Sequence, residues 1–145
     1  MSTNGRTDVS DREDRQDISD VLVRYGTGID SRDWPLFRTV FTDDCVLDYG
    51  EIGVWNGVDA VVEFMVAAHD LAGHTLHRIT NQAAVVTGDT ATARAYVDAV
   101  IMSQDNTSGV NAAGFYDDEL VRTRTGWRIA RRRFTTVFVR TVSAG

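Results

Sequence analysis

The sequence contains no lysine, so all 15 of its basic residues are arginines. This absence excludes Schiff-base chemistry on a lysine, including pyridoxal phosphate enzymes built in that way. It also excludes a P-loop, whose lysine is obligatory. The single cysteine, Cys45, permits no internal disulfide, which agrees with a reducing compartment.

Long apolar runs are also missing. No run approaches the roughly 20 residues that a membrane helix needs, and residues 1–8 lack the apolar stretch of a signal peptide. We therefore expect a cytoplasmic protein without a membrane partner. The net charge of −6 argues against nucleic-acid binding, because nucleic-acid proteins usually carry a basic surplus. The only basic run, residues 131–133, falls in a predicted strand whose neighbouring side chains point to opposite faces, so it cannot form one patch.

The 145 residues suit one domain, because two domains of half this length would each struggle to bury a core. We expect that domain at residues 10–141, after a disordered tail at residues 1–9. Ser10 and Glu13 form a capping box, and apolar residues at helical spacing follow in residues 18–29. These signals predict a first helix.

Two more helices and a series of strands follow the first helix. Gly26 and Gly28 suggest where the first helix ends or bends. Asp33 and Pro35 open a short second helix, and Asn56-Gly57 opens a third one. Short strands are predicted at 45–49 and 52–55, and four long strands at 75–86, 90–104, 112–124 and 127–140. Helices first and a long antiparallel meander after them indicate an α+β architecture, in which a curved antiparallel or mixed sheet packs against three N-terminal helices.

Polar side chains at positions where the pattern favours apolar ones are candidates for a site. Tyr25 lies on the buried stripe of the first helix, so it is either a core tyrosine or a functional donor. Asp30 follows five residues later, about 140° around the helix axis, so spacing alone does not bring the two together. Asp98 lies within a strand on the same face as Tyr96 and Met102. There it is either paired with an arginine or poised for chemistry.

Two other aspartates offer alternative sites. Asp48 lies in a short strand, and on an apolar face its pKa would be raised, which would suit a base near neutral pH. Asp118 shares a strand face with Tyr116 and could pair with Arg131 or Arg133 across a hairpin.

The histidines point to acid/base chemistry more than to a metal. His74 and His77 lie three residues apart in a predicted strand, so only one of them can face a pocket. This weakens a metal site built on them and His69, whereas a lone histidine can act as an acid or base. Asn81 follows four residues after His77 and would share its face. With no metal motif and no nucleophile elbow, we expect a site without metal or cofactor that transfers protons on an apolar substrate.

Several segments resemble the SnoaL-like proteins of the nuclear transport factor 2-like superfamily: residues 21–25, 30–34, 41–49, 77–81 with the pattern H-x-x-x-N, 88–91 and 126–129. The resemblance implies a cone-shaped α+β fold around one apolar pocket. We expect this pocket to be lined by Trp34, Phe37, Tyr49, Trp55, Phe64, Asn81, Tyr96, Met102 and Tyr116.

Tyr25, Asp30 and His77 resemble the dehydratase branch of the superfamily, and Asp98 resembles a further acid of bile-acid dehydratase. The resemblance implies a cofactor-independent dehydratase for a small apolar substrate, a cyclic polyketide-, steroid- or terpenoid-like hydroxy ketone. His77 would be the base, oriented by Asp30, and Tyr25 would bind the carbonyl. Asp98 would tune the pocket or assist the departing hydroxyl. Scytalone dehydratase has a second active-site histidine, which has no clear equivalent after His77.

Two alternatives stay open at the level of the sequence. Ketosteroid isomerase resembles the chain at Tyr25 and Asp48, with Asp117 or Asp118 near its second acid, so an isomerase or polyketide cyclase with Asp48 as base is one alternative. A non-catalytic ligand-binding module is the other, because a fold does not settle a function. The uncovered side of a curved sheet favours a homodimer, although trimers occur on such folds.

Overall fold

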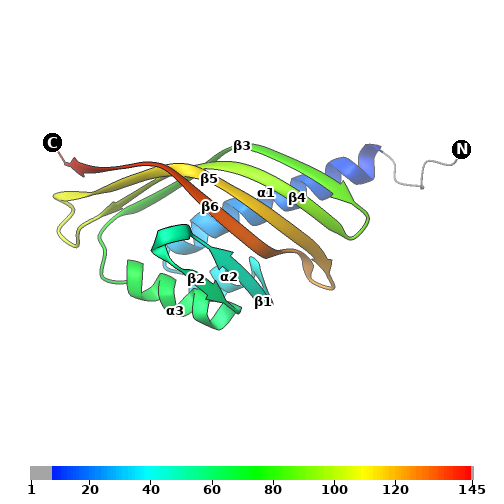
Figure 1. Cartoon of the computed structure of the whole chain (residues 1–145), viewed down its shortest axis with the longest axis horizontal. Helices are drawn as coiled ribbons and strands as arrows, with labels where there is room; N and C mark the ends of the chain where they lie inside the picture. Colours follow the sequence, from blue (N-terminus) through cyan, green and yellow to red (C-terminus); the bar gives the residue numbers. More distant parts are fainter. Residues whose placement is uncertain (1–7, 145) are drawn as a thin grey trace, which may run out of the picture.

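A computed structural model describes residues 8–144, in which three helices pack on one six-stranded sheet that is not closed into a barrel (Figure 1). Along the chain the elements are α1 (Asp8–Asp30), α2 (Trp34–Arg38), β1 (Phe41–Asp48), the 3-10 helix η1 (Gly50–Ile52), β2 (Val54–Asn56), α3 (Val58–His69), β3 (Thr75–Thr87), β4 (Thr90–Met102), β5 (Ser108–Thr123) and β6 (Gly126–Ser143).

The sheet has the strand order β2-β1-β6-β5-β4-β3. Strands β1 and β6 run parallel, and all other neighbours run antiparallel, so the sheet is mixed. The α+β class, the helices on one side and the four long strands predicted from the sequence are confirmed. None of the helices within residues 8–144 is long and apolar enough to cross a membrane.

Several boundaries differ from those predicted. Helix α1 begins at Asp8, so Ser10 lies in its first turn, and the rest of the predicted tail, residues 1–7, lies outside the described residues. Strand β5 begins at Ser108, whereas the predicted strand began at residue 112. At the second helix, the cap is confirmed, because Oδ1 of Asp33 accepts a hydrogen bond from the backbone N–H of Leu36 at 3.1 Å.

Two glycines let helix α1 approach its neighbours closely. The helix continues through both Gly26 and Gly28 to Asp30. A Cβ atom on Gly26 would lie 3.0 Å from Cβ of His77, and one on Gly28 would lie 2.9 Å from Cα of Phe37. Such contacts are too short for ordinary packing, so the missing side chains allow α1 to lie directly on β3 and α2. This contact brings the end of α1 to the start of β3.

An irregularity in β3 decides which of its side chains face the helices. The pairing of β3 with β4 shifts between Thr80 and Ala83, which marks a β-bulge. Before the bulge His77 faces the helices, whereas after it Ala84 does so. Asn81 lies in the bulge with φ 49° and is exposed. The prediction that Asn81 shares a face with His77 and lines the pocket was therefore wrong.

Candidate functional site

A carboxylate–imidazole pair joins the end of α1 to the start of β3. Nδ1 of His77 lies 2.7 Å from Oδ1 of Asp30, and the backbone N–H of His77 donates to Oδ2 of the same carboxylate at 2.9 Å. The hydroxyl of Thr75 also donates to Asp30, at 2.8 Å. Burial acts to raise the pKa of Asp30, but the hydrogen bonds from His77 and Thr75 and the charge of His77 together outweigh it and lower that pKa. Asp30 is thus a carboxylate whose contacts fix the orientation of the His77 ring.

Arg32 holds this junction in place. It follows α1 with a φ of 56°, a left-handed backbone conformation that is uncommon for a residue with a side chain. Its guanidinium donates to the carbonyl of Ile29, to the hydroxyl of Thr75 and to the carbonyl of Gly73, at 2.8 to 2.9 Å. One side chain therefore ties the end of the helix to Gly73, which precedes β3, and to Thr75, the first residue of β3.

The second nitrogen of His77 is available. The side chain is only 6% exposed, yet within residues 8–144 Nε2 has no hydrogen-bond partner and is not completely enclosed by protein atoms. Because Asp30 binds Nδ1, it favours the tautomer that carries its proton there and leaves a lone pair on Nε2. His74, by contrast, is exposed, so His77 is the member of this pair that faces the helices.

A second histidine, which the sequence analysis did not select, lies beside His77. The ring of His69, at the end of α3, has its centroid 5.8 Å from that of His77. Its Nδ1 lies 2.9 Å from the carbonyl of Met65, and its Nε2 is buried without a partner among the described residues. Burial is the main cause that lowers the pKa of His69, so this ring is neutral near pH 7. The apolar helix pattern around His69 was the only signal that could have placed it inside.

Two tyrosine hydroxyls form a hydrogen bond near His77. The Tyr25 and Tyr49 hydroxyl oxygens lie 2.7 Å apart, and both side chains are buried. The Tyr25 ring stands at 84° to the His77 ring, with centroids 6.1 Å apart. The centroid of the Tyr116 ring lies 5.5 Å from that of Tyr25. Burial raises the pKa of Tyr49 and of Tyr116 well above the ordinary value, so both phenols keep their protons.

A buried arginine, also missed from the sequence, lies against the tyrosines. The Arg132 guanidinium carbon is 3.7 Å from the centroid of the Tyr116 ring and 4.4 Å from that of Tyr25. It donates two hydrogen bonds to Asp118, at 2.7 and 2.8 Å, whereas its Nη1 is enclosed without a partner among residues 8–144. Burial raises the pKa of Asp118, against the opposing effect of the Arg132 cation. The predicted pairing of Asp118 with Arg131 or Arg133 was wrong, because these two point to the other face of the sheet.

The predicted pocket residues divide between the two faces of the sheet. Six of them belong to the inner aromatic layer between sheet and helices: Trp34, Phe37, Tyr49, Trp55, Phe64 and Tyr116. Within this layer the Trp55 and Phe64 rings stack at 4.0 Å. The side chains of Tyr96, Asp98 and Met102 lie on the outer face, since in β4 it is the odd-numbered residues 91–99 that are buried.

Asp98 is therefore corrected from a pocket residue to an outer-face residue. It accepts hydrogen bonds from Asn111 at 2.7 Å and from Arg78 at 3.2 Å. The hydrogen bond from Asn111 is the main cause that lowers the pKa of Asp98. A carboxylate paired in this way on the far side of the sheet cannot assist a reaction at His77.

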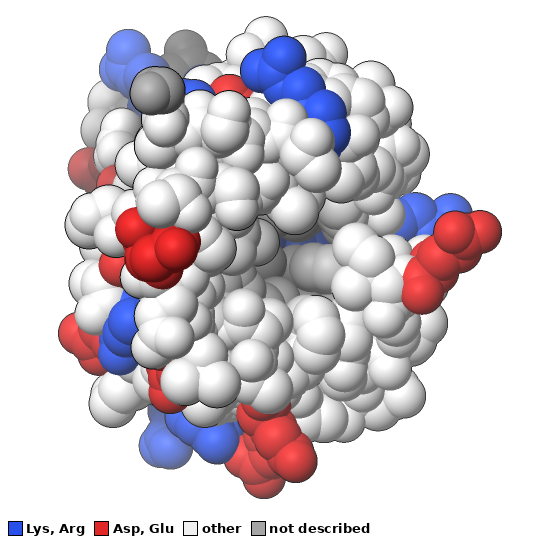
Figure 2. Space-filling model, turned by 90° about the vertical axis from the view of Figure 1, so that its left-hand side faces the viewer, with Lys and Arg blue, Asp and Glu red and all other residues white. Residues whose placement is uncertain are grey.

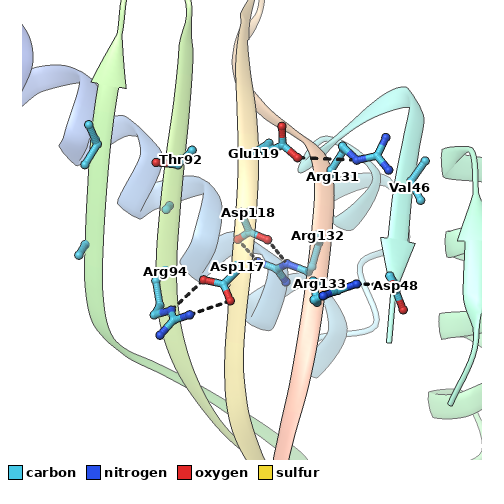
Figure 3. A pocket seen from close by; sticks show the side chains of 13 residues that line it. Val46, Asp48, Thr92, Arg94, Asp117, Asp118, Glu119, Arg131, Arg132 and Arg133 are labelled. Atoms are coloured by element: carbon cyan, nitrogen blue, oxygen red, sulfur yellow. Dashed lines mark hydrogen bonds and ion pairs between the residues drawn. The ribbon is translucent and has the colours of Figure 1, made fainter. Parts of the chain in front are cut away.

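Asp48, the alternative base, also lies on the outer face, where it borders a recess of about 610 Å³ (Figure 3). The backbone N–H of Gly50 donates to its Oδ1 at 2.9 Å, and Arg133 lies 3.4 Å from its Oδ2. The hydrogen bond from Gly50 lowers the pKa of Asp48. The expected raised pKa was therefore wrong, and a carboxylate with a lowered pKa is a weak base.

The end of the molecule that carries the β4–β5 turn and the C-terminus is hollowed. Figure 2 looks directly at this end, with the sheet above and α3 below, and uncharged atoms surround a hollow near its centre. Basic atoms are visible at the bottom of the hollow.

A family model and a protein of known sequence match most of the chain. The model described as a SnoaL-like domain matches residues 10–133. An uncharacterized protein of Mycobacterium tuberculosis is 31% identical over 140 residues, which are 90% of this chain and 90% of that protein.

Solved structures repeat the fold over nearly its whole length. A proposed aromatic ring hydroxylase of Novosphingobium aromaticivorans is 31% identical, with a TM-score of 0.82 over 92% of this chain and 94% of that one. A proposed scytalone dehydratase of the same organism is 19% identical, with a TM-score of 0.84 over 96% and 93% of the two chains. At that identity the second match bears on the fold alone.

Proposed function

Because the chain belongs to the SnoaL-like domain family, we propose that it is a cofactor-independent lyase that removes water from a cyclic hydroxy ketone. The substrate is polyketide-, steroid- or terpenoid-like and binds between the sheet and the helices. His77 acts as the general base. The observation that carries the proposal is the 2.7 Å contact of His77 Nδ1 with Asp30, which leaves Nε2 unpaired.

The reaction begins with removal of a proton from the carbon next to the substrate carbonyl. Nε2 of His77 takes this proton, and the carboxylate of Asp30 stabilises the imidazolium that forms. The electron pair left on carbon delocalises into the carbonyl as an enolate. When the enolate collapses, the carbon–oxygen bond to the β-hydroxyl breaks, and the imidazolium returns its proton to the departing oxygen. The products are an unsaturated ketone and water, and His77 is again neutral.

The tyrosine pair supplies the hydrogen bond that the enolate needs. Tyr25 and Tyr49 carry two hydroxyl protons, of which their mutual hydrogen bond uses one. The other proton is free for the oxygen of the substrate. The Arg132 cation, 4.4 Å from the Tyr25 ring, adds a positive charge behind this donor. A donor and a fixed cation stabilise a developing oxyanion most in a site that excludes water.

The proposal revises two parts of the expected mechanism. Asp98 has no role at the reacting centre, because it is paired with Asn111 and Arg78 on the outer face. The isomerase or cyclase with Asp48 as base is not retained, since Asp48 lies on the outer face with a lowered pKa. The two other buried carboxylates of the described chain do not replace Asp98 as a second acid, because Arg122 holds Asp14 and Arg132 holds Asp118.

The test is a turnover screen with a panel of cyclic β-hydroxy ketones, in which mass spectrometry detects the loss of water from each substrate. Wild-type protein is compared with His77→Ala and with His74→Ala, which removes an exposed histidine three residues away. We expect His77→Ala to lower kcat/KM by about 10²- to 10⁴-fold, the usual contribution of a general base. His74→Ala should retain wild-type activity, because its ring lies outside the site.

Circular dichroism and thermal unfolding establish that each variant is folded. Equal loss of activity in both histidine variants, or full activity in His77→Ala, would overturn the assignment of the base. If wild-type protein converts no ketone but binds apolar ligands, and His77→Ala binds them equally well, the chain is a ligand-binding module and the dehydratase proposal fails.

A further inference from the structure

The inner face of the sheet is covered at one end and open at the other. Towards the β3–β4 turn, Ala93 and Leu120 are 6% and 1% exposed. Towards the β4–β5 turn, Val110 and Val139 are 41% and 60% exposed. Both valines belong to the inner face, because the cross-strand pairs continue the register of the buried residues of β4 and β5. The open part therefore belongs to the end of the molecule that is hollowed in Figure 2.

His77 begins a row of side chains that crosses this open part of the inner face. The cross-strand pairs place Ala99 on β4, Ala112 on β5 and Val139 on β6 beside it, in that order. Residues directly opposite one another on neighbouring strands point to the same face. Strands lie about 4.8 Å apart, so the row is about 14 Å wide from β3 to β6. Apart from His77, its side chains are apolar and none is larger than valine.

The two alanines keep the space above the sheet free next to the proposed base. Elsewhere on the inner face of β5, Tyr116 and Leu120 fill the space towards the helices. Ala112 carries only a methyl group at the corresponding place. At the head of the row, the His77 side chain is 6% exposed, and its Nε2 has no hydrogen-bond partner within residues 8–144. A ligand that reaches Nε2 therefore has apolar surface beside it across the width of the row.

We propose that Ala99 and Ala112 determine the size of the substrate, whose apolar body of several fused rings lies along this row from His77 to Val139. The inference rests on the dehydratase proposal for the position of the ketone, next to His77 and Tyr25. A single six-membered ring covers only the first part of a row about 14 Å wide. A fused ring system extends over both alanines and reaches the exposed valine. The row thus selects fused-ring ketones over single-ring ketones.

The chemistry of the row fits a hydrocarbon body. His77 is the only ionisable side chain in it. The next row towards the β4–β5 turn has no ionisable side chain and consists of Thr75, Ile101, Val110 and Thr141. Removal of apolar surface from water favours binding in proportion to the area covered. In an apolar site, one further methylene group changes binding by about tenfold or more. Each added ring that covers the exposed valines therefore strengthens binding.

Titration with three ketones that differ in size tests the inference. Cyclohexanone has a single ring, decalone has two and androstanone has four, and none carries the β-hydroxyl, so none can lose water. Tryptophan fluorescence follows the binding of each. Wild-type protein should bind androstanone at least about tenfold more tightly than cyclohexanone. Ala112→Leu fills the middle of the row, so it should weaken the binding of androstanone by about tenfold or more and leave that of cyclohexanone unchanged.

Ala113→Leu is the matched control, because Ala113 is the next residue of β5 and points to the outer face opposite Asp98. It should bind all three ketones as wild type does. Val139→Ser changes an exposed position and keeps the test valid if Ala112→Leu does not fold. It should weaken the binding of androstanone by about threefold or more, since apolar contact is lost. Thermal unfolding checks that each variant is folded.

The inference is overturned if wild-type protein binds androstanone no more tightly than cyclohexanone. It is also overturned if the folded Ala112→Leu and Val139→Ser variants bind androstanone as wild type does, or if Ala113→Leu weakens it equally. These titrations need no turnover, so the two proposals fail separately. Tight binding that depends on Ala112, without any loss of water from β-hydroxy ketones, would overturn the dehydratase alone. Turnover that depends on His77, without a preference for larger ketones, would overturn the size determinant alone.

Discussion

Arg132 and Asp118 form two hydrogen bonds, at 2.7 and 2.8 Å, and their side chains are 1% and 0% exposed. A buried ion pair contributes little net stability, because desolvation of both charges offsets their attraction. Its loss is costly nevertheless, since removal of one partner leaves the other charge buried and unpaired. The inner face is therefore sensitive to the loss of either partner.

The first prediction concerns this pair. Arg132→Met should lower the free energy of unfolding by about 3–5 kcal/mol, because the carboxylate of Asp118 loses its counter-ion. The double variant Arg132→Met with Asp118→Leu should recover most of that loss, since both charges are then replaced by apolar groups. Urea unfolding followed by circular dichroism measures both. A single variant as stable as the double one would contradict the prediction.

The second prediction concerns the pH dependence that Asp30 gives to stability. Its pKa is lowered in the folded protein, so its contribution to stability is complete above the unfolded value of about 3.9 and is lost as the pH falls through the folded value. Asp30→Asn should therefore be less stable than wild type at pH 7, and the difference should shrink below about pH 4. Urea midpoints from pH 7 to pH 3 test this, with Asp59→Asn as the control. A difference that grows in acid would refute it.

The third prediction concerns His69, whose pKa is lowered mainly by burial. Below the unfolded-state pKa of about 6.5, the histidine of the unfolded chain binds a proton, whereas the buried ring of the folded protein stays neutral. The folded protein therefore loses stability as the pH falls. His69→Phe should remove this loss, so the variant should gain stability relative to wild type between pH 7 and pH 5. Urea midpoints at the two pH values measure it, and His74→Phe, at an exposed position, should show no such gain.

The fourth prediction concerns the close contact of α1 with β3. A Cβ atom on Gly26 would lie 3.0 Å from Cβ and 3.1 Å from the carbonyl oxygen of His77. Gly26→Ala should cost about 1–3 kcal/mol by overpacking, partly offset by about 1 kcal/mol of improved helix propensity. It should also shift the imidazole NMR signals of His77. Thr27→Ala, at the exposed neighbouring position, should change neither, and an unshifted His77 in Gly26→Ala would argue against direct contact.

The fifth prediction concerns Cys45, which is fully buried in β1. Burial, helped by the nearby Asp44 carboxylate, raises the pKa of its thiol to about 11. At pH 8 only about one thiol in a thousand is then a thiolate, the form that reacts with disulfide reagents. Native protein should react slowly with such a reagent, and protein unfolded in guanidinium should react at once. Rapid reaction of native protein would show that β1 opens readily.

The assignment of residues to the inner and outer faces of the sheet could be predicted from the sequence only in part. Period-two spacing established which residues share a face, and it correctly separated Arg132 from Arg131 and Arg133. It could not establish which face the helices cover. Asp98 was therefore assigned to the interior together with Tyr96, although the alternate residues of β4 are the buried ones.

At two places an irregularity in the sheet made predictions from period-two spacing wrong. The bulge after Thr80 turned Asn81 outward, although it follows His77 at an even interval. Another shift of register, between Glu119 and Leu120, lies beside the buried pair of Asp118 with Arg132. Bulges depend on how two strands meet. Asn81, a residue type that tolerates a positive φ, is compatible with the first bulge but does not by itself predict it.

The sequence by itself determined the helices and the long strands, because periodicity, caps and turn residues act over a few neighbouring residues. The family was recognised from the resemblance of several short segments to its members. The resemblance named Asp30 and His77, but only the tertiary structure showed that they are in contact. Asp30 and His77 are 47 residues apart, and their contact depends on Gly26 allowing α1 to lie on β3 and on Arg32 holding the junction. Contacts across such separations follow from the packing of whole elements, which local patterns do not encode.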